Sequence, residues 1–315
     1  MHLHIAYASD DNYVQHLGAS LVSLLDNNKE FEKISIHILD NNLSDLNRNR
    51  LKCIGEQYQR EIVFYELKKL LDSLKKFEIP DTISITAYSR LFLSELIDSK
   101  IDKIIYADCD SIFESSLQSL WNINFNAFSI AAVEDHVGAA NKTNIGINVV
   151  CRYINSGFLL MNLVKIRDED GLNKMMNVIK KYNGKVQHHD QGVINAAFDN
   201  DIFYLHPKYN TMTSLYDFKN VQSIEDYYGA TKYYSQEIIT EAKENPVFIH
   251  FTPGFSKRPW IKGCRHPLQN KYWKYLSMTP WENELKQEDK RQLKYKLIEK
   301  IYWIFGYKIY KIIFS

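Results

Sequence analysis

Cysteine is scarce in this sequence, and neither sign of charge is in excess. The four cysteines, Cys53, Cys109, Cys151 and Cys264, lie far apart and form no CxxC pair. That spacing argues against a structural zinc site and against a disulfide framework, and it favours a reducing compartment. The formal net charge is +1 over 315 residues, so we do not expect nucleic acid as a partner.

Long apolar runs, flexible linkers and internal repeats are also absent. No stretch reaches the roughly 20 apolar residues that a membrane-spanning helix needs. The N-terminal "MHLHIAYASDD" has neither a basic start nor a long apolar core, which argues against a signal peptide. We therefore expect a cytoplasmic protein.

The first hundred residues alternate between strand-like and helix-like patterns. Short apolar runs predict strands over 3–8, 33–39, 61–65 and 103–107, and apolar spacing predicts helices over 14–28, 44–59 and 85–97. This alternation predicts an α/β fold with a parallel sheet, which binds ligands at the carboxyl ends of its strands. The second half is less regular, with strands expected over 129–135, 155–163 and 246–251 and helices over 171–182 and 191–198.

The C-terminal residues 290–315 differ from the rest of the chain. They carry seven Lys or Arg residues and a single acid, Glu299, and apolar and aromatic residues recur between the charges. A basic, aromatic, amphipathic helix is typical of segments that lie on an anionic membrane surface. We expect this tail to hold the protein as a peripheral protein on the inner face of the cell membrane. The alternative is a C-terminal helix packed on the body.

Three pairs of aspartates are separated by one residue: Asp108/Asp110, Asp168/Asp170 and Asp199/Asp201. Only the first pair follows directly on an apolar strand; the second lies in a polar run and the third precedes a strand. Residues two apart in an extended segment face the same way, so the first pair can bind one hard cation such as Mn²⁺ or Mg²⁺. The alternative is a turn at the strand end with solvated acids.

His250 ends an apolar strand and is followed by "TPGFSKRPW". A lone histidine there is usually a core residue, but Gly254, Lys257 and Arg258 supply flexibility and positive charge close behind it. A histidine ligand followed by cations suits a metal-bound diphosphate. In "HHDQGVIN", Asp190 is a candidate helix cap that can also point into the same site.

An apolar strand followed by D-x-D is also how haloacid-dehalogenase-type phosphatases begin. In those enzymes a Thr or Val follows the second Asp by two residues, whereas this chain has Ile112, and the motif lies deep in the chain. This alternative is therefore the less favoured one.

The chain resembles glycosyltransferase family 8, whose members include the bacterial lipooligosaccharide galactosyltransferases and the glycogenins. Seven motifs carry the resemblance in family order: "IAYASDDNY", "ISITAYSRL", "IIYADCDSIF", "AAVED", "INSGFLLMN", "HHDQGVIN" and "IHFTPGFSKRPW". The resemblance implies a GT-A fold, in which one α/β domain with a mostly parallel central sheet binds the nucleotide. We assign that catalytic domain to residues 1–280 and an amphipathic helical tail to residues 281–315.

The resemblance also implies roles for individual residues. The metal ligands are Asp108, Asp110 and His250. The first loop, which holds uridine and ribose, contains Ala8, Asp10, Asn12 and Tyr13. Cations and polar groups for the diphosphate and the donor sugar are Arg90, Asp135, Asn155, Asp190, Gln191, Gly254 and Lys257.

The chain departs from the family pattern at three places. The loop after His250 is longer than usual, so the cation that contacts phosphate is either Lys257 or Arg258. Pro253 stands where a glycine is common, and Cys109 occupies the middle of the D-x-D motif beside the nucleotide.

The activity implied by the resemblance is retaining, metal-dependent transfer of galactose or glucose from a UDP-sugar to a surface glycan or a lipid-linked saccharide. Asp190, Gln191 and Asp135 are the candidate catalytic residues. Retention of configuration fits either a double displacement, with Asp190 or Gln191 as nucleophile, or a same-face route in which the leaving phosphate takes the acceptor proton. The alternative is a catalytically inactive protein that binds nucleotide sugars.

Overall fold

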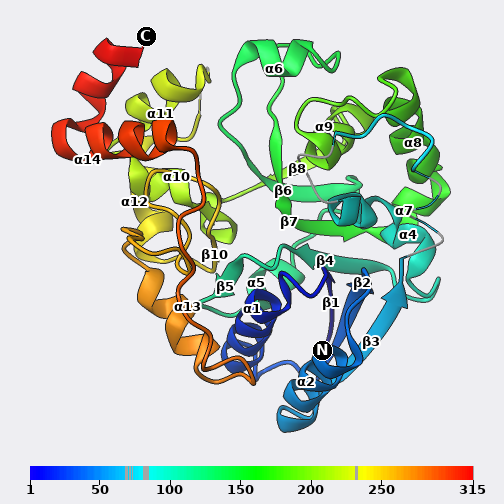
Figure 1. The fold of residues 1–315 in the computed structure, drawn as a ribbon. Coiled ribbons are helices and arrows are strands. Elements are labelled where there is room, and N and C mark those ends of the chain that lie inside the picture. The colour runs from blue at the N-terminus through cyan, green and yellow to red at the C-terminus, as the bar shows by residue number, and fades with distance from the viewer. Residues whose placement is uncertain (68–69, 71, 73, 81–84, 231–232, 315) are drawn as a thin grey trace.

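A seven-stranded sheet forms the centre of the molecule, with strand order β3-β2-β1-β4-β7-β6-β8 (Figure 1). The computed structural model describes residues 1–67, 70, 72, 74–80, 85–230 and 233–314. The strands are β1 (His2–Ser9), β2 (Lys33–Asp40), β3 (Glu61–Glu66), β4 (Lys103–Ala107), β6 (Ile130–Glu134), β7 (Ile154–Asn162) and β8 (Ile202–Leu205). Only β7 runs against its neighbours β4 and β6. The predicted α/β fold with a mostly parallel sheet is confirmed.

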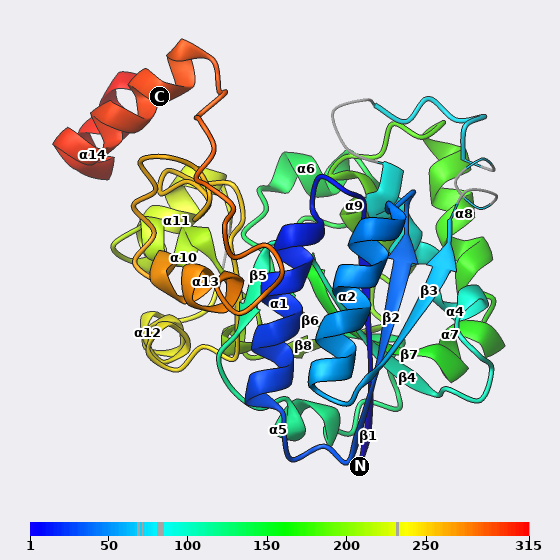
Figure 2. The same cartoon turned by 60° about the horizontal axis from the view of Figure 1, so that its bottom comes forward.

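Helices cover both faces of this sheet because its strands are apolar on both sides. The helices α1 (Val14–Asn27) and α2 (Asp45–Gln57) lie on one face, in front of β1 and β2 in Figure 2. The neighbouring residues Ile104 and Ile105 belong to two different buried clusters, one on each side of the sheet. The opposite face is covered by α4 (Leu93–Leu96), α7 (Leu163–Asp168), α8 (Gly171–Lys181) and α9 (His189–Ala197). The hydroxyl of Ser44 accepts a hydrogen bond from the amide of Asn47 and caps α2, where the sequence predicts a helix over 44–59.

The helix predicted over 85–97 has a different form. The segment is a 3₁₀ helix, η1 (Ile85–Phe92), followed by the single turn of α4. The buried side chains of Tyr88 and Leu91 lie three residues apart, which places them on one face of a helix with three residues per turn. Residues 83 and 84, which begin part of the "ISITAYSRL" motif, lie outside the described residues.

A second, three-stranded sheet positions His250, the last residue of its apolar strand. It consists of β5 (Ser111–Phe113), β10 (Phe248–His250) and β9 (Thr211–Met212), in the order β5-β10-β9. The strands β5 and β10 are antiparallel and pair Ser111 with His250. This register brings His250 next to Asp110, which immediately precedes β5.

Shorter helices complete the body. They are α5 (Gln118–Trp121), α6 (Ala139–Thr143), η2 (Pro207–Tyr209), α10 (Thr213–Asp217), α11 (Val221–Tyr228), α12 (Gln236–Glu244) and α13 (Gln269–Leu276). The helix α13 packs on α1, where the hydroxyl of Tyr272 lies 2.6 Å from Nδ1 of His16.

The tail forms the helix α14 (Leu293–Phe314), interrupted at Gly306, where φ is 74° and ψ is 173°. It lies beside α11 at the edge of the molecule (Figure 1). Tyr302 is buried with Phe218 and Phe255, while Ile304 and Ile312 on the other side of the helix are 70% and 78% exposed. The predicted helix is confirmed, and it both packs on the body and presents apolar residues to solvent. Among the described residues, no helix is long and apolar enough to cross a bilayer.

Buried histidines predict a loss of stability in mild acid. Burial lowers the pKa of His16 to about 3 and that of His37 and His266 to about 4. In the unfolded chain these rings take up protons near pH 6.5, whereas the folded protein does not until about pH 4 or below. The free energy of unfolding should therefore fall as the pH is lowered from 6.5 to 4, by roughly 1.4 kcal/mol per pH unit for each such ring.

Urea unfolding at several pH values measures this dependence. Among the described residues, eight histidines have a lowered pKa, whereas only three carboxyl groups, those of Glu134, Asp190 and Asp217, have a raised one and act in the opposite direction. Replacing His37 by Asn should reduce the slope, because one of the titrating rings is removed. A free energy of unfolding that stays constant between pH 6.5 and 4 would contradict the prediction.

Candidate functional site

A cavity of 590 Å³ opens at the carboxyl ends of β1 and β4, where the sequence places it. The residues that line it come from six separate segments of the chain: Ala8, Ser9, Asp10, Tyr13, Thr86, Ala87, Arg90, Tyr106, Asp108, Cys109, Asp110, Ser156, His188, Asp190, Gln191, His250, Thr252, Pro253 and Arg258. Most of the predicted site residues are in this set. The cavity is therefore the place to examine their chemistry.

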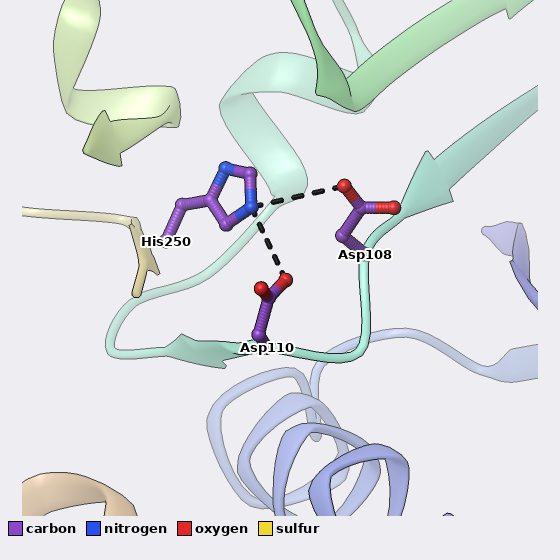
Figure 3. Close-up of side chains that lie close together, drawn as sticks. All are labelled: Asp108, Asp110 and His250. Atoms are coloured by element: carbon purple, nitrogen blue, oxygen red, sulfur yellow. Dashed lines mark ion pairs between the residues drawn. The ribbon is translucent and has the colours of Figure 1, made fainter. Parts of the chain in front are cut away.

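Asp108, Asp110 and His250 meet at one wall of the cavity (Figure 3). Nε2 of His250 lies 3.2 Å from Oδ1 of Asp110 and 3.7 Å from Oδ2 of Asp108. One nitrogen or oxygen atom from each residue lies within 4.8 Å of the other two. Two carboxylates and one imidazole form a donor set that suits Mn²⁺ or another hard-to-borderline divalent ion. The residues therefore fit the metal that the resemblance implies.

Two arginines, Arg258 and Arg90, each pair with one of the two aspartates. An NH2 group of Arg258 donates to Oδ2 of Asp110 at 2.7 Å, and that of Arg90 donates to Oδ1 of Asp108 at 2.8 Å. Burial disfavours the charged form of Asp110, but Arg258 and His250 outweigh it and hold the pKa of this carboxyl below its ordinary value. Asp110 therefore keeps its charge although it lies buried beside Asp108.

Gly157 of β7 leaves the room that this trio occupies. A Cβ atom at position 157 would lie 2.2 Å from Cε1 of His250 and 2.8 Å from Oδ2 of Asp108. The carbonyl oxygen of Gly157 also accepts a hydrogen bond from the amide of Asp108 at 2.8 Å. A glycine is thus required at this position by contact with two of the metal-ligand candidates.

Arg90 is buried and its guanidinium is surrounded by acceptors. Besides Asp108, it contacts Oδ2 of Asp190 at 3.1 Å and donates to the carbonyl oxygen of Ser156 at 2.6 Å. The guanidinium also lies over the ring of Tyr106. Burial lowers the pKa of Arg90, but Asp108 and Asp190 more than compensate and raise it above its ordinary value. Arg90 thus forms ion pairs with both Asp108, a metal-ligand candidate, and Asp190.

Asp190 is not the cap of α9, so that part of the prediction is wrong. The capping position is His188, whose backbone is left-handed, and Asp190 lies in the first turn of the helix. Its side chain points into the cavity instead, where Oδ2 accepts from the hydroxyl of Ser156 at 3.1 Å. Burial raises the pKa of Asp190 despite the nearby charge of Arg90.

Asp135, Asn155 and Gln191 form a hydrogen-bonded triangle next to Asp190. Oδ2 of Asp135 accepts from Nδ2 of Asn155 at 3.1 Å and from Nε2 of Gln191 at 3.0 Å, and Nδ2 of Asn155 also donates to Oε1 of Gln191 at 3.1 Å. Burial would raise the pKa of Asp135, but His136 and these two amides lower it overall. Asp135 and Gln191 also line an adjoining cavity of 320 Å³.

The first loop is organised by Asp10. Its Oδ1 accepts from the amides of Asn12 and Tyr13 at 2.9 Å and 3.2 Å, which orders the entry to α1. Ala8, Asp10 and Tyr13 line the main cavity. The thiol of Cys109 donates to the carbonyl oxygen of Ala8 at 3.2 Å and ties this loop to the D-x-D motif.

The loop after His250 separates two residues that the sequence groups together. Arg258 lines both the main cavity and a neighbouring cavity of 660 Å³, whereas Lys257 lines only the neighbouring one, together with Asn12 and Gly254. Nζ of Lys257 lies 3.3 Å from Oδ2 of Asp289 and does not line the main cavity in this structure. A Cβ atom at Gly254 would lie 2.4 Å from Oδ2 of Asp217, so the backbone of this loop approaches that carboxyl closely.

The pattern described as "Glycosyl transferase family 8" matches residues 4–264. The chain belongs to glycosyltransferase family 8. General stress protein A of Bacillus subtilis (strain 168) is 28% identical over 283 residues, which cover 89% of this chain and 94% of that protein. Lipopolysaccharide 1,3-galactosyltransferase of Salmonella typhimurium (strain LT2) is 26% identical over 289 residues, which cover 89% of this chain and 79% of that protein.

Solved structures confirm the fold of this family 8 glycosyltransferase. The galactosyltransferase LgtC, solved in complex with donor and acceptor sugar analogs, superposes with a TM-score of 0.69 at 24% sequence identity. The matched region covers 88% of this chain and 96% of LgtC. The GT-A fold expected from the resemblance is therefore confirmed.

Asn210 is a residue of the site that sequence reasoning missed. It is fully buried, its Oδ1 lies 3.2 Å from Nδ1 of His250, and its Nδ2 donates to Oδ1 of Asn155 at 2.9 Å. An acceptor at Nδ1 places the proton of a neutral imidazole there and leaves the Nε2 lone pair facing the two aspartates. The sequence shows only an asparagine after "KY", and nothing in that pattern indicates a contact with His250.

Replacing Asn210 by alanine should weaken metal binding without removing a ligand. Loss of such an outer partner typically costs 10- to 100-fold in metal affinity. Titration of Mn²⁺ followed by electron paramagnetic resonance measures the change. Asn28→Ala is the matched control, since Asn28 is also fully buried but bonds only to the carbonyl of Leu24 and the amide of Leu117. Equal metal affinities for the two variants would show that Asn210 does not orient His250.

Proposed function

We propose that this glycosyltransferase is metal-dependent and retains configuration while moving galactose or glucose from a UDP-sugar to a saccharide acceptor. The observation that carries the proposal is the convergence of Asp108, Asp110 and His250 in one wall of the main cavity, with Arg258 beside them. A divalent ion bound by this trio would supply positive charge to the leaving diphosphate. The relative from Salmonella, named as a lipopolysaccharide galactosyltransferase, supports a hexose donor and a surface-glycan acceptor.

Arg258, and not Lys257, is the cation that we assign to the diphosphate. Arg258 is inside the cavity and 2.7 Å from Asp110, whereas Lys257 is bonded to acids of the tail. Negative charge that develops on the leaving phosphate is stabilised by donors that are already in place. The first loop, with Ala8, Asp10 and Tyr13, then receives the nucleoside.

Asp190 is placed to stabilise positive charge on the donor sugar. Its carboxylate is buried in the cavity wall, and Arg90 and Ser156 hold Oδ2. Because Oδ2 is already engaged by these two groups, it is less available to attack the anomeric carbon. We therefore favour an electrostatic role for Asp190, and with it the same-face route. Both polar atoms of the Gln191 amide are engaged by Asp135 and Asn155, so Gln191 is assigned to orienting sugar hydroxyls together with Asp135.

Hydrolysis of a panel of UDP-sugars with and without Mn²⁺ tests the proposed function. We expect Mn²⁺-dependent release of UDP from UDP-galactose or UDP-glucose. Binding of UDP-sugar with no turnover, even with saccharide acceptors present, would favour the inactive binding protein. Release of phosphate from small phosphoesters would favour the phosphatase, which membership of family 8 already disfavours.

The exposed side of α14 is the surface that we assign to the membrane. Replacing Ile304 and Ile312 by serine should release the protein from anionic vesicles, because each loses apolar area available for insertion at roughly 25 cal/mol per Å². UDP-sugar hydrolysis should be unchanged, since these side chains are exposed and belong to none of the cavities above. Leu46→Ser on α2, which is 61% exposed, is the control. Unchanged binding in a vesicle sedimentation assay would contradict the assignment.

A further inference from the structure

In the loop 253–260, the adjacent cations Lys257 and Arg258 contact different groups. The backbone of Lys257 is left-handed, with φ of 62°, a conformation that residues with a side chain rarely adopt without support from their surroundings. Beyond this turn Arg258 reaches Asp110 in the main cavity, and Lys257 reaches Asp289 and Glu299 of the tail. The position of Arg258 therefore depends on a turn that Lys257 makes.

Lys257 is part of a compact cluster of two bases and two acids. Its Nζ lies 3.3 Å from Oδ2 of Asp289 and 3.2 Å from Oε1 of Glu299. Arg291 bonds to the same two acids, with Nε 3.0 Å from Oδ1 of Asp289. The side chains of Lys257, Asp289 and Glu299 are all less than 15% exposed. Arg291 is more exposed, at 36%. Ion pairs that are mostly buried and charge-balanced hold their members in one arrangement more strongly than surface pairs do.

The tail also contacts the loop 253–260 through hydrogen bonds to backbone carbonyls of the loop and through an aromatic stack. The amide of Gln287 donates to the carbonyl of Trp260 at 2.7 Å. On the other side of Lys257, Nε1 of Trp303 donates to the carbonyl of Phe255 at 3.2 Å, and the rings of Phe255 and Tyr302 stack at 3.9 Å. Tail contacts thus lie before, at and after the turn in the loop.

We infer that Lys257 is a positioning residue, and that it forms with Asp289, Arg291 and Glu299 a clamp through which the C-terminal tail holds the loop 253–260 and places Arg258 at the metal site. The inference rests on the proposed function in one respect, the contact of Arg258 with the diphosphate. In this role the tail supports binding of the nucleotide-sugar donor, and the role is separate from any contact of the tail with a membrane.

A rival interpretation gives the same contacts the opposite effect. If Lys257 itself were a phosphate ligand, Asp289 and Glu299 would hold it away from the nucleotide and inhibit binding. Removing the two acid charges would then free Lys257 and strengthen UDP binding. In the clamp the same change loosens the loop and weakens UDP binding, so the sign of the effect separates the two interpretations.

The deciding variant is therefore the double change Asp289→Asn with Glu299→Gln, which keeps the shape of both side chains. Two readouts apply: the Kd for UDP with Mn²⁺ by calorimetry, and amide hydrogen exchange of residues 253–260 without nucleotide. We expect UDP binding to weaken about 10-fold and exchange in the loop to accelerate by a similar factor. Lys257→Met should act in the same direction, because it removes the other half of the clamp.

Glu288→Gln and Lys262→Met are the matched controls. Glu288 belongs to the tail and Lys262 lies two residues after the loop, and the two pair with each other, but their side chains are 73% and 58% exposed. Both readouts should therefore stay at the wild-type level. Tighter UDP binding by the double variant would overturn the inference, and so would wild-type UDP affinity or wild-type exchange. If the unaltered protein bound no UDP at all, the proposed function would fail, while hydrogen exchange would still decide whether the clamp orders the loop.

Discussion

Replacing Asp110 by alanine is expected to abolish high-affinity Mn²⁺ binding and to lower the rate of UDP-sugar hydrolysis at least 10³-fold. Asp110 supplies one of the three ligand atoms that lie together in the structure, and its other oxygen holds Arg258 at 2.7 Å. The change therefore removes a ligand and also releases the cation assigned to the diphosphate. A 10³-fold loss corresponds to about 4 kcal/mol of transition-state stabilisation, the amount that one well-placed electrostatic group supplies in other enzymes.

The measurements are Mn²⁺ titration of the variant and hydrolysis rates at saturating UDP-sugar. Asp168→Ala is the matched control, because Asp168 belongs to a D-x-D pair of the same spacing but is exposed at the end of α7. Circular dichroism verifies that both variants are folded. If Asp110→Ala kept its metal affinity and its rate, the trio would not be the metal site and the proposed function would lose its main support.

Replacing Gly157 by alanine is expected to damage the same site without removing any polar group. The new methyl carbon would lie 2.2 Å from a ring carbon of His250 and 2.8 Å from a carboxylate oxygen of Asp108, far inside van der Waals contact. On the β4 side, the backbone at position 157 is held by the hydrogen bond from the amide of Asp108 and by the pairing of Phe158 with Ala107, so we expect the side chains to move. We expect a loss of metal affinity of 100-fold or more, together with about 1–3 kcal/mol of stability lost to overpacking.

Gly18→Ala separates the two effects. A Cβ atom at Gly18 would lie 2.7 Å from Cζ3 of Trp281 and has no atom of the trio among its near contacts. This variant is therefore also overpacked but leaves the trio alone. It should lose stability in urea and keep its Mn²⁺ affinity. Comparable metal affinity in the two glycine variants would refute the steric account of position 157.

The strongest predictions from sequence concern residues joined by short-range geometry. Asp108 and Asp110 lie two apart after an apolar strand, and the first loop follows another strand of the same parallel sheet. Parallel strands bring their carboxyl ends to one edge. The aspartate pair and the first loop therefore lie close together in the fold. The segment 85–97 is helical, as the sequence predicts, and most of it is a 3₁₀ helix. The sequence does not distinguish the two helix types because the period of three and the period of 3.6 differ little over so short a segment.

The residues that sequence reasoning missed or misplaced are positioned by contacts between segments that lie far apart in the sequence. Asn210 meets His250 only because β9 and β10 pair, and β9 has two residues. Such a strand is too short to leave a pattern. The expectation that Asp190 caps its helix failed because the cavity offers its carboxylate the hydroxyl of Ser156 and the guanidinium of Arg90 instead.

The division of the chain at residue 280 stays a prediction, although the tail is closely connected to the body. Tyr302 and Trp303 pack on or bond to the segment around Phe255, and Asp289 and Glu299 pair with Lys257. The two alternatives for the tail therefore apply to different sides of one helix: one side packs on the body, and the other is the surface assigned to the membrane.

By itself the sequence determined the α/β fold class, the edge of the sheet where the main cavity opens, and the pair of aspartates at that edge. Those features follow from residue order, because side-chain alternation and strand polarity are local properties of a chain. Only the tertiary structure decided that His250 faces this pair through a second small sheet, that Gly157 leaves room for all three, and that Lys257 and Arg258 point apart. Such facts depend on which distant segments pack together, and packing is settled by shape and burial over the whole molecule.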